Sequence, residues 1–297
     1  MTSVSKPGHG LPFAVGAYVL WGMMPAFITL LNGVDPYRLV AWRVLWTIPV
    51  CLVFLLIWGG FRRVRTAFSD RRALALLLLA SLLISVNWIV YVVAVQAGYF
   101  YAASLGYYIN PLINVLLGTI FLKERLSRLQ WLAVAVAAVG IAILALEARA
   151  TLYVSIALAL SFGFYGLIRK QVSVEAVPGL TVEVLLLTLP AIAALFVLPE
   201  GARAFGDDWN VSLLLMAAGL MTGAPLVLFA TAARRMTYSA LGFVQFLAPT
   251  MVFLQGLLVF GEELKTAQGI CFALIWTAIA LFCGDIAMKS RRRPAAN

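Results

Sequence analysis

Charged residues are scarce in this sequence. Only 11% of its 297 residues are charged, whereas 63% are hydrophobic. A soluble domain typically holds about 25% charged and about 45–50% apolar residues. So few polar residues could not cover the surface of a water-soluble fold of this length. A soluble globular protein is therefore excluded, and we expect the chain to lie in a lipid bilayer.

Side chains that commonly catalyse reactions or bind metals are also few. The single histidine, His9, lies in the polar N-terminal segment, and the three cysteines, Cys51, Cys271 and Cys283, fall inside apolar stretches. Isolated cysteines in odd number form neither a disulfide framework nor a zinc site, so we interpret them as small apolar residues. There is no Gly-rich phosphate loop and no pair of intramembrane acids. The sequence thus predicts no enzyme, no cofactor and no metal site.

Long apolar runs take up most of the chain. Ten of them approach the roughly 20 residues needed to cross the hydrocarbon core as a helix; they cover about residues 11–31, 38–58, 73–96, 101–121, 129–147, 151–168, 180–199, 211–232, 238–260 and 267–287. Helices are required because lipid offers no partner to unpaired backbone groups. We therefore expect an all-α membrane protein with ten transmembrane helices.

The basic residues are distributed unevenly over the connections between these runs. Of the 22 Lys and Arg residues, seventeen face the cytoplasm if the N-terminus does; one lies inside a run (Arg43), and four lie on the opposite side (Arg38, Arg149, Arg203 and Lys265). Basic residues gather on the cytoplasmic side of membrane proteins. We therefore expect both chain ends in the cytoplasm and read the net charge of +10 as a sign of orientation, not of nucleic-acid binding.

The chain also repeats itself. A shift of 138 residues places Pro111, Gly118, Glu124, Leu126 and Gln130 on Pro249, Gly256, Glu262, Leu264 and Gln268. Each half, 11–147 and 151–287, then holds five helices, and because five is odd the second half must enter the membrane inverted. Inverted repeats are typical of secondary transporters, whose halves rock around a central site. The architecture therefore predicts transport of small molecules, although a fold alone names no substrate.

Several stretches resemble a known family. Residues 103–114 and 122–131 resemble the EamA-type repeat of the drug/metabolite transporter superfamily, and residues 87–88, 161–170, 224–229 and 241–250 resemble its RarD branch. The resemblance implies a basket of ten helices from two inverted EamA repeats, around a cavity lined by the first, third, fourth, sixth, eighth and ninth spans. It implies a bacterial inner-membrane exporter of amino acids, as in the YddG branch, or of amphenicols and other drugs, as in the RarD branch.

Polar and aromatic side chains near mid-membrane are the candidate substrate ligands, because such groups are costly there unless they face a cavity or a partner. We expect these eight to line one central cavity: Trp21, Asn87, Trp88, Tyr91, Tyr107, Asn110, Tyr165 and Gln245. Amides and flat rings together suit a zwitterionic head group with an apolar side chain. The alternative is that the amides bond helices to one another as structural contacts.

Arg43, Pro111 and Pro249 are the candidate gating or hinge residues. Arg43 either snorkels to the outer interface or contacts a substrate carboxylate. Prolines inside a span free backbone carbonyls and permit bending. No acid is expected near mid-membrane, which favours gradient-driven transport or coupling through a peripheral acid such as Glu183. The small-molecule substrate and the lipid bilayer are the expected partners, and a monomer is compatible with the sequence.

Overall fold

The computed structural model describes residues 10–97, 99–147, 149–199, 202–258 and 265–291, and these ranges are helical with no strand. The elements are α1 (Leu11–Gly22), α2 (Met24–Thr29), α3 (Pro36–Trp58), α4 (Phe61–Ser69), α5 (Arg71–Gln96), α6 (Phe100–Ile120), α7 (Arg128–Glu147), the short helix η1 (Arg149–Thr151), α8 (Leu152–Gln171), α9 (Ala176–Val197), α10 (Trp209–Arg235), α11 (Tyr238–Gln245), α12 (Leu247–Leu258) and α13 (Thr266–Arg291). The expected all-α class is confirmed.

Helix starts are set by side chains that accept hydrogen bonds from otherwise unpaired backbone amides. Asp35 caps α3, where its carboxylate accepts from the amides of Tyr37 and Arg38 at 3.0 Å each. Asp70 caps α5 in the same way. Because such caps sit at the ends of apolar runs, they fix where the chain enters and leaves the apolar layer.

Nine helical segments within the described ranges are long and apolar enough to cross a membrane. They comprise α1 with α2, α3, α5, α7, α8, α9, α10, α11 with α12, and α13. The helix α6 is 21 residues long but carries Asn110 and Asn114 between its apolar residues, and it is not one of the nine. The protein is therefore a multi-pass membrane protein.

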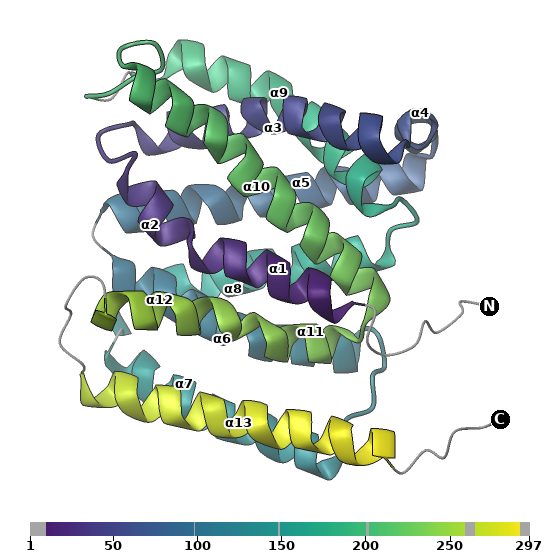
Figure 1. Ribbon diagram of the computed structural model, residues 1–297, viewed down its shortest axis with the longest axis vertical. Helices are drawn as coiled ribbons and strands as arrows, with labels where there is room; N and C mark the ends of the chain where they lie inside the picture. The colour runs from purple at the N-terminus through teal and green to yellow at the C-terminus, as the bar shows by residue number, and fades with distance from the viewer. Residues whose placement is uncertain (1–9, 98, 148, 200–201, 259–264, 292–297) are drawn as a thin grey trace.

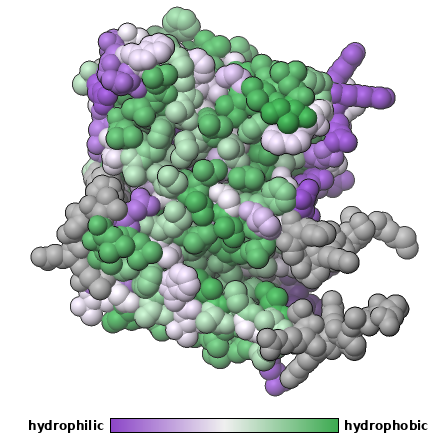
Figure 2. Space-filling model, viewed as in Figure 1, coloured by the Kyte–Doolittle hydropathy of each residue, from purple (hydrophilic) through white to green (hydrophobic). Residues whose placement is uncertain are grey.

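The surface agrees with a lipid environment. Large apolar side chains point outward along the helices, among them Leu56, Leu189 and Phe196, which are 74%, 78% and 86% exposed. On the face shown in Figure 2 hydrophobic residues fill the band between two ends where hydrophilic residues gather. An apolar band between two polar rims is the surface that a bilayer covers.

The helices run side by side, roughly along one direction, with the start of α1 and the end of α13 on the same side of the molecule (Figure 1). α3 packs against α9 and α10, and α8 packs against α5 and α6. α1 lies between α10 and the pair α11–α12, while α13 packs along α7. The core between these helices holds the polar and aromatic residues that concern function.

Two of the expected spans are interrupted. The first run divides at Met23 into α1 and α2, just before Pro25, and the ninth divides at Phe246 into α11 and α12, just before Pro249. Proline lacks the amide that would continue the hydrogen-bond ladder. In contrast, α6 continues through Pro111, so only one of the two paired prolines lies beside a break in its helix.

The sequence did not predict α4. This nine-residue helix follows two glycines with positive φ, Gly59 at 73° and Gly60 at 119°, a conformation that other residues rarely adopt. It exposes its arginines and buries Ala67. Short amphipathic helices of this kind lie at the membrane interface.

Candidate functional site

Arg43 lies at the centre of a buried cluster formed by four helices. Its Nε donates a hydrogen bond to Thr222 Oγ1 on α10 at 3.0 Å, and its guanidinium lies 5.2 Å from the centre of the Trp88 ring on α5. The guanidinium also interacts electrostatically with the hydroxyls of Tyr91 on α5 and Tyr107 on α6. The rings of these two tyrosines are 5.4 Å apart, edge to face. Three of the predicted site residues thus gather around Arg43.

Of the two alternatives for Arg43, snorkelling to the outer interface does not agree with its burial. Its side chain is directed into the helix bundle, and the residue is only 4% exposed. The inward direction of Arg43 results from a close crossing of α3 and α10, where a Cβ on Gly219 would lie 2.3 Å from the backbone of Trp46. Thr47 strengthens this crossing by donating to the Gly219 carbonyl at 3.2 Å. Arg43, one turn before Thr47, is therefore held against α10.

Asn87 connects α5 to α8. Its Nδ2 donates to the Leu158 carbonyl at 3.0 Å and to Ser161 Oγ at 3.1 Å, and the residue is 6% exposed. Both donors of the amide are therefore occupied by protein in this conformation. The adjacent Trp88 belongs to the Arg43 cluster, which consists of Arg43, Trp88, Tyr91, Tyr107 and Thr222. Asn87 therefore joins this cluster to α8.

A second group of predicted residues lies in an aromatic cluster, defined here as Tyr18, Trp21, Phe162, Tyr165 and Phe229 from α1, α8 and α10. The Trp21 ring lies 5.2 Å from Phe162, 5.6 Å from Phe229 and 5.7 Å from Tyr18. Tyr165 stacks on Phe229 at 6.2 Å. Ring pairs at these separations attract one another beyond their burial. Trp21 and Tyr165 were predicted, whereas Phe162 and Phe229 were missed because they look like ordinary apolar residues.

Gln245 and Asn110 complete the predicted set. Gln245 is 2% exposed, and its Oε1 accepts from Asn114 Nδ2 at 2.7 Å and from the Tyr18 hydroxyl at 3.5 Å. It therefore contacts the aromatic cluster from α11. Asn110 is also 2% exposed, and its Oδ1 has no hydrogen-bond partner within the described residues.

The prolines are related to the site by their positions. Proline removes the amide that would bond to the carbonyl four residues earlier. Three predicted site residues occupy that earlier position: Trp21 before Pro25, Tyr107 before Pro111 and Gln245 before Pro249. Pro111 and Pro249 also lie where α6 contacts α11 and α12, since a Cβ on Gly242 would lie 2.9 Å from the Pro111 carbonyl oxygen and the Tyr108 hydroxyl donates to the Pro249 carbonyl at 3.4 Å.

Comparison with known proteins decides the family. The EamA-like transporter family matches residues 8–146. An uncharacterized transporter of Pseudomonas aeruginosa is 43% identical over 96% of this chain and 97% of its own length. Protein RarD of Escherichia coli is 35% identical over 96% of this chain and 97% of its own. The chain belongs to the RarD-type transporters of the drug/metabolite transporter superfamily.

Two further comparisons concern name and fold. A second Pseudomonas aeruginosa relative of this RarD-type transporter, named chloramphenicol-sensitive protein RarD, is 31% identical over 96% of this chain and 97% of its own length. A solved crystal structure with 20% sequence identity superposes with a TM-score of 0.73 and covers 93% of this chain and 98% of that one. At this identity the superposition supports the fold alone.

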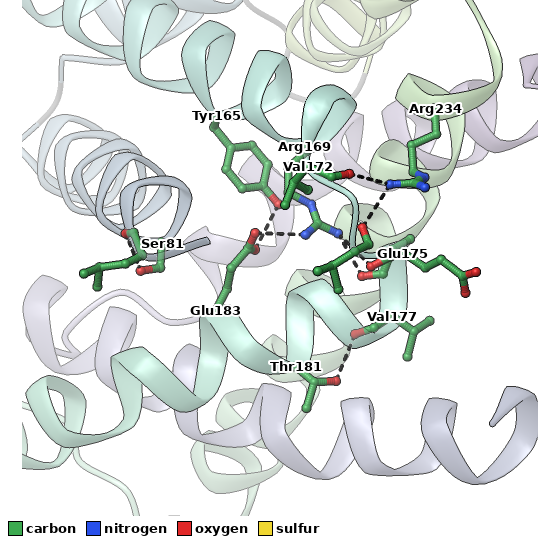
Figure 3. Close-up of polar contacts among 12 residues, drawn as sticks. Ser81, Tyr165, Arg169, Val172, Glu175, Val177, Thr181, Glu183 and Arg234 are labelled. Atoms are coloured by element: carbon green, nitrogen blue, oxygen red, sulfur yellow. Dashed lines mark hydrogen bonds and ion pairs between the residues drawn. The ribbon is translucent and has the colours of Figure 1, made fainter. Parts of the chain in front are cut away.

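The RarD-type chain also contains a buried ion pair that sequence reasoning did not foresee. The side chains of Arg169 on α8 and Glu183 on α9 are 0% and 1% exposed, and Nη1 donates to Oε1 at 3.2 Å. The Tyr165 hydroxyl donates to the other carboxylate oxygen at 3.4 Å, and Arg169 Nη2 donates to the Ala176 carbonyl at 2.9 Å (Figure 3). A lone acid inside the apolar start of α9 was the available signal, since such an acid requires a partner.

The ion pair lies near the end of the bundle where α1 begins and α13 ends. Arg234 Nη1, at the end of α10, donates to the carbonyls of Val172 and Val174 at 2.8 and 3.0 Å (Figure 3). Lys170 donates to the carbonyls of Ala233 and Met236. These basic side chains join the α8–α9 turn to the end of α10.

An open cavity of about 2140 Å³ lies at this same end. Its lining includes Leu11 and Phe13 of α1, Lys170 of α8 and Arg234 of α10, together with Trp276 and other residues of α13. The eight predicted site residues do not line this cavity; six of them are buried, and Trp21 and Tyr107 are partly buried.

Proposed function

We propose that the chain is an inner-membrane secondary transporter that exports amino acids, aromatic ones among them, or similarly small metabolites by alternating access. It would be built from two inverted five-helix repeats, 11–147 and 151–287, with α6 as the tenth membrane span and both termini in the cytoplasm. The observation that supports this most directly is the recurrence of helix boundaries at the same 138-residue shift that aligns the sequence.

That recurrence holds at two boundaries. α6 begins at Phe100, and the pair α11–α12 begins at Tyr238. α7 begins at Arg128 and α13 at Thr266. Each of these pairs is separated by 138 residues, so the repeat extends from residue types to the starts of the helices.

The capping of α7 and α13 repeats as well. Gln130 Oε1 accepts from the Ser127 amide at 2.9 Å, and Gln268 Oε1 accepts from the Lys265 amide at 3.2 Å. These paired glutamines are the ones that the sequence shift aligned. Glu262, the counterpart of Glu124, lies outside the described residues.

Helix packing and direction are consistent with inversion. The contacts map onto one another when the halves are exchanged: α8 on α5 and α6 corresponds to α1 on α10 and α11–α12, and α3 on α10 to α9 on α5. The α6–α7 connection lies on the side where α1 begins and α13 ends, whereas α12 lies toward the opposite side (Figure 1). Paired segments that run in opposite directions support an in-plane two-fold axis.

The substrate class is supported by the chemistry of the two clusters. The Arg43 cluster offers a cation and hydroxyls, and the aromatic cluster offers flat apolar surface, which together match a polar head group on an apolar body. A second candidate is amphenicol or multidrug efflux, which is favoured by the name of the chloramphenicol-sensitive relative. The two candidates make different predictions for transport.

Counterflow in proteoliposomes would test them. Proteoliposomes that contain the purified protein and are loaded with unlabelled amino acid should accumulate labelled aromatic amino acid. Loading with chloramphenicol instead of the amino acid should not support this accumulation. Asn87→Ala and Tyr91→Ala should reduce the rate at a temperature where both variants remain folded, although Asn87→Ala should lower the melting temperature because it removes two hydrogen bonds to α8. The matched controls Asn210→Ala and Tyr153→Ala remove the same groups from exposed positions. Accumulation of chloramphenicol without amino acids would favour the second candidate, and loss of transport in step with unfolding would make Asn87 and Tyr91 structural.

A further inference from the structure

We propose that Arg43 is the anion-binding residue of this transporter and that it receives the carboxylate of the transported substrate. The inference rests on the proposed transport function and narrows it, because it restricts substrates to molecules that carry a free carboxylate. It is carried by an observation that the proposed function does not need: Arg43 is a buried cation that has no counter-charge among the described residues.

The charge balance around Arg43 is incomplete. The side chain forms no ion pair within the described residues, and its Nη1 has no hydrogen-bond partner there. Its Nε has Thr222 Oγ1 as acceptor, and its Cζ lies over the Trp88 ring, 5.2 Å from the ring centre. These contacts hold the guanidinium in place but supply no negative charge. The buried acid Glu183 pairs with Arg169 instead.

A buried, unpaired cation is costly. Removing an ion from water costs several kcal/mol even after the surroundings relax, and inside a membrane such a group marks a functional site by default. A guanidinium has five N–H donors in a planar fork that matches both oxygens of a carboxylate. The free Nη1 makes Arg43 a receptor for such an anion, and the bound carboxylate would supply the missing charge.

The surroundings indicate what the rest of the ligand looks like. Asn87 directly precedes Trp88 in the sequence, and its amide donates a hydrogen bond to Ser161 Oγ on α8. The next residue on α8, Phe162, belongs to the aromatic cluster with Trp21 and Phe229. A route of contacts therefore leads from the cation to apolar rings. A ligand with a carboxylate at one end and a ring at the other fits this order, whereas a neutral amphenicol leaves Arg43 unpaired.

Binding to the purified protein in detergent tests the inference separately from transport. A ligand that binds only the folded state raises the melting temperature with its concentration. L-Phenylalanine and phenylacetate, which share a ring and a carboxylate, should both raise it and bind measurably by calorimetry. L-Phenylalaninamide keeps the ring and the ammonium but replaces the carboxylate, so it should bind at least about tenfold more weakly. A further titration uses sodium chloride alone.

Arg43→Gln should abolish the difference between phenylalanine and its amide. Because the change removes an uncompensated charge, the ligand-free variant should melt at the same temperature as the parent protein or higher. Arg43→Lys keeps the charge but loses the fork, so it should restore part of the carboxylate binding. Arg65→Gln is the matched control, since it makes the same change at an exposed position of α4.

Four results would overturn the inference. Equal binding of phenylalanine and its amide, or unchanged carboxylate binding by Arg43→Gln, would show that Arg43 is not the receptor. Unfolding of Arg43→Gln would make the residue structural, and saturation by chloride alone would make the site a halide site. Carboxylate binding that depends on Arg43 without any counterflow would instead leave this inference standing and refute the proposed transport of these substrates.

Discussion

Glu124 and Tyr238 lie 114 residues apart in sequence, yet the Glu124 carboxylate accepts a hydrogen bond from the Tyr238 amide at 2.6 Å. The same carboxylate accepts from the Ser239 amide at 2.9 Å and from its hydroxyl at 2.7 Å. Glu124 follows α6 and Tyr238 begins α11, so an acid from one half of the chain caps a helix of the other. A negative charge at a helix N-terminus is further stabilised by the helix dipole.

Replacing this cap should loosen the contact between the halves. Glu124→Ala leaves two amides and the Ser239 hydroxyl without their acceptor, and we expect a loss of about 1–2 kcal/mol. Glu124→Gln keeps one carbonyl acceptor and should lose less. Melting temperatures in detergent measure both effects, and equal losses for the two variants would show that the charge, not the hydrogen bonds, is responsible.

The crossing of α3 and α10 should not tolerate an added methyl group. A Cβ on Gly219 would lie 2.3 Å from Trp46 backbone atoms, which cannot move aside as a side chain could. Gly219→Ala should therefore cost at least about 2 kcal/mol. Gly284→Ala in α13 is the matched control, because no atom lies within 4 Å of its added Cβ and alanine favours a helix by about 1 kcal/mol. Similar melting temperatures for the two variants would contradict the close crossing.

The ion pair between Arg169 and Glu183 should behave as one unit. Glu183→Gln leaves the Arg169 charge buried without a partner, which typically costs about 3–5 kcal/mol. The double variant Arg169→Gln with Glu183→Gln should lose less than either single variant. Glu175→Gln breaks the exposed pair with Arg63 and should cost less than about 1 kcal/mol. A double variant whose loss equals the sum of the single losses would show that the two residues do not depend on one another.

The proposed topology makes a labelling prediction. In a variant with Cys51, Cys271 and Cys283 replaced by alanine, a cysteine at Ser69 should react with an impermeant maleimide only after the inner membrane is opened. A cysteine at Asp207 should react in intact cells. Both positions are exposed, so access to the reagent depends on the side of the membrane. The opposite labelling pattern would show that the protein has the inverse orientation, and it would refute the orientation derived from the basic residues.

Much of the fold could be predicted from the apolar runs and from the turn residues and helix caps between them, because a backbone in lipid must form continuous helices. The start of α3 after Asp35 and the paired starts of α7 and α13 follow from local capping chemistry. The helix α4 was missed because a nine-residue basic stretch with few apolar residues gives no span signal. The candidate hinges Pro111 and Pro249 did not show which of the two spans is interrupted, because α6 continues through Pro111 whereas the helix before Pro249 is interrupted at Phe246.

The site was harder to predict than the fold. Stripes of amides and rings located Asn87, Tyr91 and Tyr107 on helix faces, but no stripe shows which helices meet. The inward course of Arg43 depends on the close approach at Gly219, which is a tertiary contact far away in sequence. Thr222 contacts Arg43, and Phe229 belongs to the aromatic cluster. Both are chemically ordinary residues inside one apolar run, so only the fold shows their role.

The difference between the two proline helices has a consequence for how the carrier would change state. The helix is interrupted at Phe246, between α11 and α12, whereas the paired position in α6, Tyr108, lies in an unbroken helix. In inverted-repeat carriers each half can adopt the shape of the other. The state that opens to the opposite side should then carry its interruption at Tyr108 and have a continuous helix at Phe246. Pro111→Ala and Pro249→Ala should accordingly bias the protein toward opposite sides of the membrane, so that the position of the interruption reports which way the carrier faces.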